Sequence, residues 1–340
     1  MAKWGQYSRV NSVLEDDSLL TEIEAALVRV RGVAIPTPLL PFRDNAFIKA
    51  ESLQPTGSFK IRGAYNAMAR LTPDERSRGV VTHSSGNHAQ AIARAGRLLG
   101  IRAVVVMPST APQVKVAGVR GDGAEIVFVG PHNEERVARA HEIADRDGME
   151  LIPSANHIAV IAGQGTIGFE ICEQLLELET DAAAVAAPVV LVPIGLGGLA
   201  AGVAAAIHRT FPAARVYGVE PSIAADTRDS LARGERVTWP AKQTSATIAD
   251  GLRGESPAEI PFAILQRHLA GVIVVEEAEI VNAMKVAARE AHLVLEPSGA
   301  ISLAAHVYHR DELPKGPVVM VASGGNVDPQ RYTEWLATPD

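Results

Sequence analysis

The feature that most constrains the fold is a repeated order of short apolar segment, glycine turn and helical pattern, which begins at residue 79. Segments typical of buried strands stand at 80–82, 101–107, 125–129 and 149–152. A second series of such segments stands at 189–194, 215–220, 271–275 and 317–322. Strands that alternate with helices are joined by right-handed crossovers, so the sequence predicts an α/β fold with mostly parallel sheets.

Composition narrows the classes of function. With 340 residues and a net charge of −7, the chain is long enough for a large core, and nothing favours nucleic acid or an anionic membrane as a partner. No apolar stretch is long enough to span a membrane, and the first residues lack a signal-peptide pattern. The single cysteine, Cys172, excludes an internal disulfide and a thiolate metal cluster. We therefore expect a cytoplasmic protein with a buried structural thiol.

Lys60 is the side chain around which the candidate chemistry gathers. Residues 55–57 predict a turn, Ser58 is the expected N-cap, and the spacing over 59–71 predicts a helix with Lys60 in its first turn. The helix dipole and burial both favour the neutral amine, which attacks a carbonyl group to form a Schiff base. The alternative is an ordinary solvated lysine.

A glycine-rich turn follows the apolar segment at 189–194 and opens a helical pattern. Its residues are Gly195, Leu196, Gly197, Gly198 and Leu199. Free N–H groups and the dipole at a helix start favour a phosphate, and tight packing is the alternative. The spacing does not match a dinucleotide fingerprint.

A polar turn lies between the apolar segment at 80–82 and the next helical pattern. Its residues are Ser84, Ser85, Gly86, Asn87 and His88. The N–H groups of such a turn suit the carboxylate of an amino acid. In the alternative interpretation, Ser85 or Asn87 only caps the helix.

Two further segments carry side-chain oxygen atoms that are candidates for contact with a ligand or a cation. Ser323 follows the last apolar segment, at the carboxyl edge of the predicted sheet where α/β sites collect; a capped glycine turn is the alternative. Glu220 and Asp226 place two carboxylates in one loop, an arrangement that suits Mg²⁺ or Ca²⁺, although acidic loop residues are often only solvated.

The residues around Lys60 resemble the cofactor-lysine motif of the serine/threonine dehydratase and serine racemase family. The resemblance extends over about 36–328 and brings four motifs into the family order. It implies a fold type II pyridoxal-phosphate (PLP) enzyme with two open, twisted, mostly parallel sheets flanked by helices. A small domain at 80–153 is expected within a large domain formed by 1–79 and 154–340. The chain departs from the family at Leu196, where four consecutive glycines are usual.

The resemblance also implies a role for each site residue. Lys60 holds PLP as a Schiff base, and Ser85 is an acid or base on the opposite face of the cofactor ring. The expected cofactor contacts are Phe59, Lys60, Asn87, Gly195, Leu196, Gly197, Gly198, Leu199, Glu296 and Ser323. The expected substrate contacts are Ser84, Ser85, Gly86, Asn87, His88 and Arg136. Arg136 is equally well explained as an ordinary helix arginine. Glu220, the carbonyl of Ala224 and Asp226 are the expected ligands of Mg²⁺, with Ca²⁺ or Mn²⁺ as alternatives.

By this resemblance we expect a homodimeric ammonia-lyase that converts L-threonine or L-serine to a 2-oxo acid and ammonia. Ser85 leaves a serine or aspartate racemase open, because proton exchange on two faces needs two groups. Arg136 leaves a 3-hydroxyaspartate dehydratase open. An inactive binding protein that keeps the fold is the alternative from another class.

Overall fold

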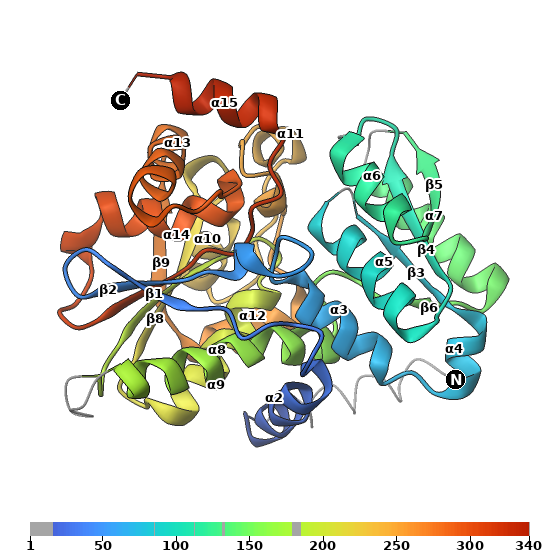
Figure 1. Cartoon of the computed structure of the whole chain (residues 1–340), viewed down its shortest axis with the longest axis horizontal. Coiled ribbons are helices and arrows are strands. Elements are labelled where there is room, and N and C mark those ends of the chain that lie inside the picture. Colours follow the sequence, from blue (N-terminus) through green and yellow to red (C-terminus); the bar gives the residue numbers. More distant parts are fainter. Residues whose placement is uncertain (1–15, 85, 112, 131–132, 179–184, 340) are drawn as a thin grey trace.

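The computed structural model describes residues 16–339 except 85, 112, 131–132 and 179–184, and Figure 1 shows two layered α/β units side by side. A six-stranded sheet has the order β1-β2-β10-β7-β8-β9 and is parallel except for the β1–β2 pair. Its strands are β1 (Leu39–Phe42), β2 (Ala46–Lys49), β7 (Val189–Pro193), β8 (Arg215–Pro221), β9 (Leu269–Val275) and β10 (Val318–Val321). The α/β fold predicted from the strand and helix pattern is confirmed.

Helices cover both faces of this sheet. One face packs against α2 (Asp16–Val30), α8 (Ile158–Leu178), α9 (Gly198–Thr210) and α12 (Glu259–His268). The other packs against α13 (Glu277–Val286), α14 (Pro297–Tyr308) and α15 (Pro329–Ala337). Because side chains alternate along a strand, Val190 and Val192 enter the first core, and Val189 and Leu191 enter the second.

A four-stranded parallel sheet has the order β5-β4-β3-β6. Its strands are β3 (Val80–His83), β4 (Ala103–Pro108), β5 (Glu125–Val129) and β6 (Glu150–Leu151). The helices around it are α3 (Lys60–Ala69), α4 (Pro73–Arg78), α5 (Asn87–Leu99), α6 (Gln113–Gly121) and α7 (Asn133–Asp147). In Figure 1, α3 runs between the two sheet units. The exact domain limits expected from the sequence remain a prediction.

Short elements complete the chain. They are η1 (Glu51–Leu53), η2 (Ser222–Ala224), α10 (Asp226–Arg233), α11 (Ala241–Thr244), η3 (Asp250–Leu252) and η5 (Arg310–Glu312). A π-helical turn at Ala287–Ala291 follows α13 directly. Cys172 is buried as expected, and burial raises the pKa of its thiol to about 11. In the part of the chain that is described, no helix combines the length and apolarity that crossing a membrane requires.

Candidate active site

Lys60 begins α3 and is partly buried. Its Nζ donates to the carbonyl oxygen of Ser154 at 3.1 Å and lies 4.8 Å from the centre of the Phe59 ring. Burial lowers the pKa of the amine to about 8, and the charge of Glu296 acts in the opposite direction. Lys60 therefore has a much larger neutral fraction near neutral pH than a solvated lysine, as nucleophilic attack on a carbonyl requires.

The expected N-cap at Ser58 is wrong. The N-cap of α3 is Phe59, and no side chain caps the helix start. Ser58 instead forms an antiparallel bridge with Gly324, and the N–H of Phe59 donates to the carbonyl of Ser323 at 3.1 Å. Pairing with the chain after β10 competes with capping and fixes the backbone that precedes Lys60.

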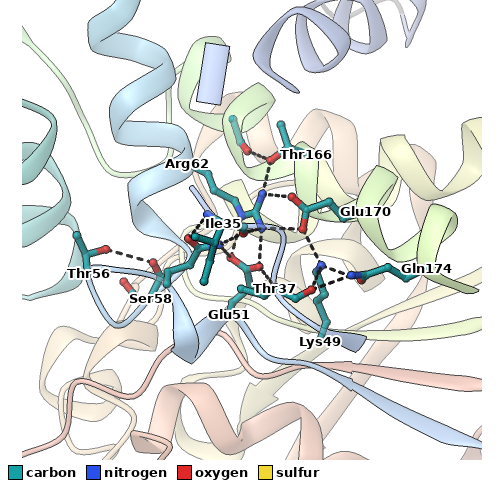
Figure 2. Close-up of polar contacts among 12 residues, drawn as sticks. Ile35, Thr37, Lys49, Glu51, Thr56, Ser58, Arg62, Thr166, Glu170 and Gln174 are labelled. Carbon is teal, nitrogen blue, oxygen red and sulfur yellow. Dashed lines mark hydrogen bonds and ion pairs between the residues drawn. The ribbon is translucent and has the colours of Figure 1, made fainter. Parts of the chain in front are cut away.

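Arg62 anchors the first turn of α3 in the interior (Figure 2). Its buried guanidinium forms ion pairs with Glu51 at 2.8 Å and with Glu170 at 2.6 Å. Further N–H groups donate to Thr166 Oγ1 at 3.1 Å and to the carbonyl of Ile35 at 3.2 Å. A buried guanidinium is tolerated only when its donors and charge are matched in this way.

Lys49 completes this interior charge cluster. Its Nζ lies 2.6 Å from Glu170 Oε2 and also donates to the carbonyl of Thr37 at 2.7 Å. Burial raises the pKa of Glu51, but the neighbouring Arg62 outweighs burial and holds that pKa below its usual value. Two cations and two carboxylates thus join η1, β2, α3 and α8, and they fix the helix that carries Lys60. Sequence reasoning did not find these pairs.

The glycine-rich turn has the geometry of a phosphate cradle. Gly197 has a φ of +90° and is the N-cap of α9, with no side chain bonded to the free N–H groups. A Cβ on Gly198 would lie 3.1 Å from Ala155, so a side chain there would require Ala155 to shift. Leu196 is not among the described positive-φ residues, and its side chain is 40% exposed. The turn therefore accepts a leucine at this position and fits a phosphate.

Asn87 and Glu296 meet at the base of the site. Asn87 Nδ2 donates to Glu296 Oε1, and Asn326 Nδ2 donates to Asn87 Oδ1 at 2.8 Å. Burial raises the pKa of Glu296 to about 7, and the charge of Asp250 acts in the same direction. Glu296 Oε2 is buried without a hydrogen-bond partner among the described residues. A bound cofactor with polar groups of its own would supply the hydrogen-bond partner that this oxygen lacks.

Asn326 is a site residue to which the sequence analysis assigned no role. It donates to the carbonyl of Thr56 at 2.8 Å as well as to Asn87. It therefore joins the turn before Lys60 to the start of α5. Its place at the end of the polar segment that begins with Ser323 was the available signal.

Ser323 is buried and lies two residues after the end of β10. Its Oγ donates to the carbonyl of Ser298 at 3.3 Å. Ser298 Oγ in turn accepts from the N–H of Gly251 at 2.9 Å. A serine hydroxyl in this position fits the nitrogen of a pyridine ring, because it can rotate to donate to it.

The polar segment at 84–88 runs into α5, which starts at Asn87, and the N-cap of this helix is Gly86 rather than Asn87. The N–H of Gly86 donates to Ser84 Oγ at 3.2 Å, and His88 Nε2 lies 3.0 Å from the carbonyl of Ile152. Burial, with the charge of Lys60 as a smaller cause, lowers the pKa of His88 to about 3, so this imidazole is neutral. Ser85 lies outside the described residues.

Arg136 lies in α7 and is half-buried, and burial lowers its pKa. Burial lowers the pKa of His83 to about 4, with the charge of Arg136 as the second cause. His83 ends β3, next to the polar turn. The positive charge of the guanidinium is therefore felt at the carboxyl edge of the four-stranded sheet, where His83 lies.

The expected cation ligands lie at the end of β8, in η2 and at the start of α10. Glu220 is buried and accepts N–H bonds from Thr227 at 3.0 Å and Arg228 at 2.9 Å. Burial raises the pKa of Glu220 to about 8 and that of Asp226 to about 7. Asp226 Oδ2 is buried without a hydrogen-bond partner among the described residues, which fits a cation ligand.

Lys60 thus lies where the chain after β6 meets the chain after β10. The chain belongs to the family described as pyridoxal-phosphate dependent enzyme, whose model matches residues 30–324. PLP is therefore the cofactor, as predicted from the motif around Lys60.

Individual relatives span most of both chains. The serine racemase of Schizosaccharomyces pombe is 35% identical over 323 residues, which cover 93% of this chain and 96% of the relative. The L-threo-3-hydroxyaspartate ammonia-lyase of Saccharomyces cerevisiae is 36% identical and covers 91% and 93%. The structure of the processed form of threonine deaminase isoform 2 from Solanum lycopersicum matches with a TM-score of 0.85 and 36% identity, over 95% of this chain and 94% of that one.

Proposed function

We propose that the protein is a PLP-dependent ammonia-lyase that converts L-threonine or L-serine to a 2-oxo acid and ammonia. The observation that carries the proposal is the buried amine of Lys60, with a pKa of about 8, held between the two sheet units. The similarity to a threonine deaminase and to a hydroxyaspartate ammonia-lyase supports the same reaction class.

Each cofactor contact has a role that its geometry supports. PLP, when bound, supplies an aldehyde for the amine and a ring that withdraws electrons from the substrate Cα. With PLP bound, the turn 195–199 would hold its phosphate, Ser323 would contact the ring nitrogen, and Asn87 with Glu296 would contact the polar edge of the ring. Phe59 packs beside the Lys60 amine. A neutral serine partner leaves the ring nitrogen largely unprotonated, which favours loss of a β-substituent over long-lived charge on Cα.

Lys60 and the polar turn act on the substrate. The N–H groups at the start of α5 hold the substrate carboxylate, with Ser84, Gly86 and His88 forming the turn. The Lys60 amine removes the Cα proton, because a group with a pKa near 8 can accept and return a proton near neutral pH. The β-hydroxyl then takes up a proton and leaves as water, and the resulting enamine is hydrolysed by one water molecule to the 2-oxo acid and ammonia.

The test is Lys60→Ala in the holoenzyme. We expect loss of the Schiff-base absorbance and of 2-oxo acid formation, while Lys242→Ala, at an exposed position, leaves both intact. Turnover by Lys60→Ala would contradict the proposal. A wild-type protein that stays colourless with added PLP would instead support an inactive binding protein.

Arg136 supports a second candidate substrate, 3-hydroxyaspartate. Its charge reaches His83 beside the polar turn, where a second substrate carboxylate could pair with it. Arg136→Met should then lower kcat/KM for L-threo-3-hydroxyaspartate far more than for L-serine. Equal losses on both substrates would contradict this role. Chiral analysis of serine and aspartate in the same assays tests racemization, for which Ser85 remains the proposed second acid or base.

We also propose a cation site and a homodimer. Glu220, the carbonyl of Ala224 and Asp226 would bind Mg²⁺, with Ca²⁺ or Mn²⁺ as alternatives, and the buried Oδ2 of Asp226 supports this assignment. The dimer rests on the family resemblance, and the cytoplasmic location rests on the single cysteine. Light scattering should give twice the mass of a single chain.

A further inference from the structure

An ion pair between Lys115 and Asp250 joins the two sheet units. Lys115 lies in α6, which packs on α5 beside the four-stranded sheet, and its side chain is only 6% exposed. Asp250 begins η3, which packs against α14 of the six-stranded unit, and its side chain is 37% exposed. The Nζ of Lys115 donates to Asp250 Oδ2. The pair therefore crosses from one unit to the other.

The cation lies against the polar turn. A Cβ added to Gly86 would lie 3.4 Å from Lys115 Nζ, so the ammonium contacts the backbone immediately before α5. The next residue, Asn87, donates to Glu296. Lys115 thus packs on the segment that positions Asn87 in the cofactor site.

The carboxylate belongs to the opposite wall of the site. The N–H of Gly251, next to Asp250, donates to Ser298 Oγ, and the carbonyl of Ser298 accepts from Ser323. The carbonyl of Gly251 also lies 2.9 Å from where a Cβ of Gly195 would be. Asp250 is therefore linked through its neighbour Gly251 to Ser298, which contacts Ser323, and to the phosphate turn at Gly195.

The charges around Lys115 compensate the burial of its ammonium group. Burial lowers the pKa of Lys115, but the charges of Asp250 and Glu296 outweigh burial and raise that pKa above its usual value. A buried ammonium is costly unless a carboxylate compensates it. Because the two charges come from different units, the pair forms only when the units lie together as described.

We propose that Lys115 and Asp250 are positioning residues that hold the two units together and fix Gly86 and Asn87 for substrate binding. This inference rests on the proposed function, in which the start of α5 holds the substrate carboxylate. N–H groups bind a carboxylate well only when they are held within about 0.5 Å of the productive geometry. The ion pair adds to the restraint that the hydrogen bonds of Asn87 with Glu296 and Asn326 place on the same segment.

The experiment compares holoenzymes of Lys115→Met, Asp250→Asn and the double variant with wild type. Amide hydrogen exchange at 86–90 reports the order of the turn without turnover, and kinetics on L-threonine and L-serine report binding. We expect faster exchange and a KM raised about tenfold in each single variant, with kcat and cofactor absorbance nearly unchanged. Because the two single substitutions remove the same interaction, the double variant should be no worse than the poorer single variant.

Two control variants separate this role from general damage. Arg102→Met breaks the exposed Arg102–Glu125 pair within the small unit, where both side chains are 54% exposed, and should change neither exchange nor KM. Lys115→Arg keeps the charge and should keep the slow exchange, even if Lys115→Met folds poorly.

Unchanged exchange at 86–90 in both single variants, or fully additive losses in the double variant, would overturn the inference. Failure of the proposed function looks different. In that case the wild-type holoenzyme turns over none of the hydroxy amino acids, while the exchange comparison still decides whether the ion pair orders the turn.

Discussion

The N–H of Phe59 donates to the carbonyl of Ser323 at 3.1 Å, and this bond joins the residue before Lys60 to the end of β10. The neighbouring residues extend the contact, because Ser58 pairs with Gly324 and the N–H of Gly325 donates to Gly57. Two motifs from opposite ends of the chain therefore form one rigid strip. These backbone bonds fix the chain before Lys60 against Ser323, the expected ring-nitrogen partner.

Gly324→Ala should disturb this strip. An added Cβ would collide with Glu296 Oε1 and lie 3.2 Å from both Asn87 Nδ2 and Ser58 Cβ. Overpacking of this kind costs about 2 kcal/mol, and we expect weaker PLP binding measured by absorbance titration. The control is Gly121→Ala, where nothing lies within 4 Å of the added Cβ. Wild-type PLP affinity in Gly324→Ala would contradict the close packing of the strip.

Arg62→Met should destabilise the protein strongly, because it leaves Glu51 and Glu170 without their buried partner. Breaking a buried ion pair costs about 3–5 kcal/mol in the free energy of unfolding, measured by urea denaturation. Arg70→Met, which breaks the partly exposed pair with Glu22, should cost less than about 1 kcal/mol. Equal losses in the two variants would show that the interior cluster is not a stabilising unit.

The amine of Lys60 should react with an acylating reagent at lower pH than other lysines in PLP-free protein. Its pKa of about 8 leaves it half neutral near pH 8, whereas solvated lysines titrate near pH 10.4. The protein is labelled at a series of pH values from about 6 to about 10, a range that brackets the pKa of Lys60. Mass spectrometry of the peptides then gives the pH at which labelling of Lys60 is half-maximal. The peptide with Lys242 is the internal control, and coincident midpoints would contradict the burial effect.

The same shift sets a pH dependence of stability. Burial lowers the folded-state pKa of Lys60, so the unfolded chain binds more protons between about pH 8 and 10.4. Across this window, the free energy of unfolding of the PLP-free wild-type protein should therefore rise with pH relative to that of PLP-free Lys60→Met. A constant difference between the two proteins over the window would show that the pKa is not lowered.

Mg²⁺ should raise the melting temperature of the wild-type holoenzyme, and a chelator should reverse the rise. Binding at 100 times the dissociation constant stabilises a protein by about 2.7 kcal/mol. Asp226→Asn should lose the effect, because it removes a charge from the buried Oδ2. Asp229→Asn, in the same helix but paired with Arg228, should keep it. A Mg²⁺ response retained by Asp226→Asn would place the cation elsewhere.

The sequence by itself determined the fold class and the order of the motifs along the chain. Hydrophobic periodicity and glycine turns predicted the strands, since these signals are local. The position of Lys60 in the first turn of α3 also followed from neighbouring residues. Recognition of the motif around Lys60 added the cofactor, and the family match confirmed it.

Only the tertiary structure decided which distant residues share a contact. Ser58 has the local chemistry of an N-cap, yet its backbone pairs with Gly324, because strand packing brings that segment alongside. Arg62 with Glu170, and Lys115 with Asp250, come from different units or helices and leave no periodic signal in the sequence. Such pairs depend on how the two sheets and their helices are placed, and burial then makes their charges strong.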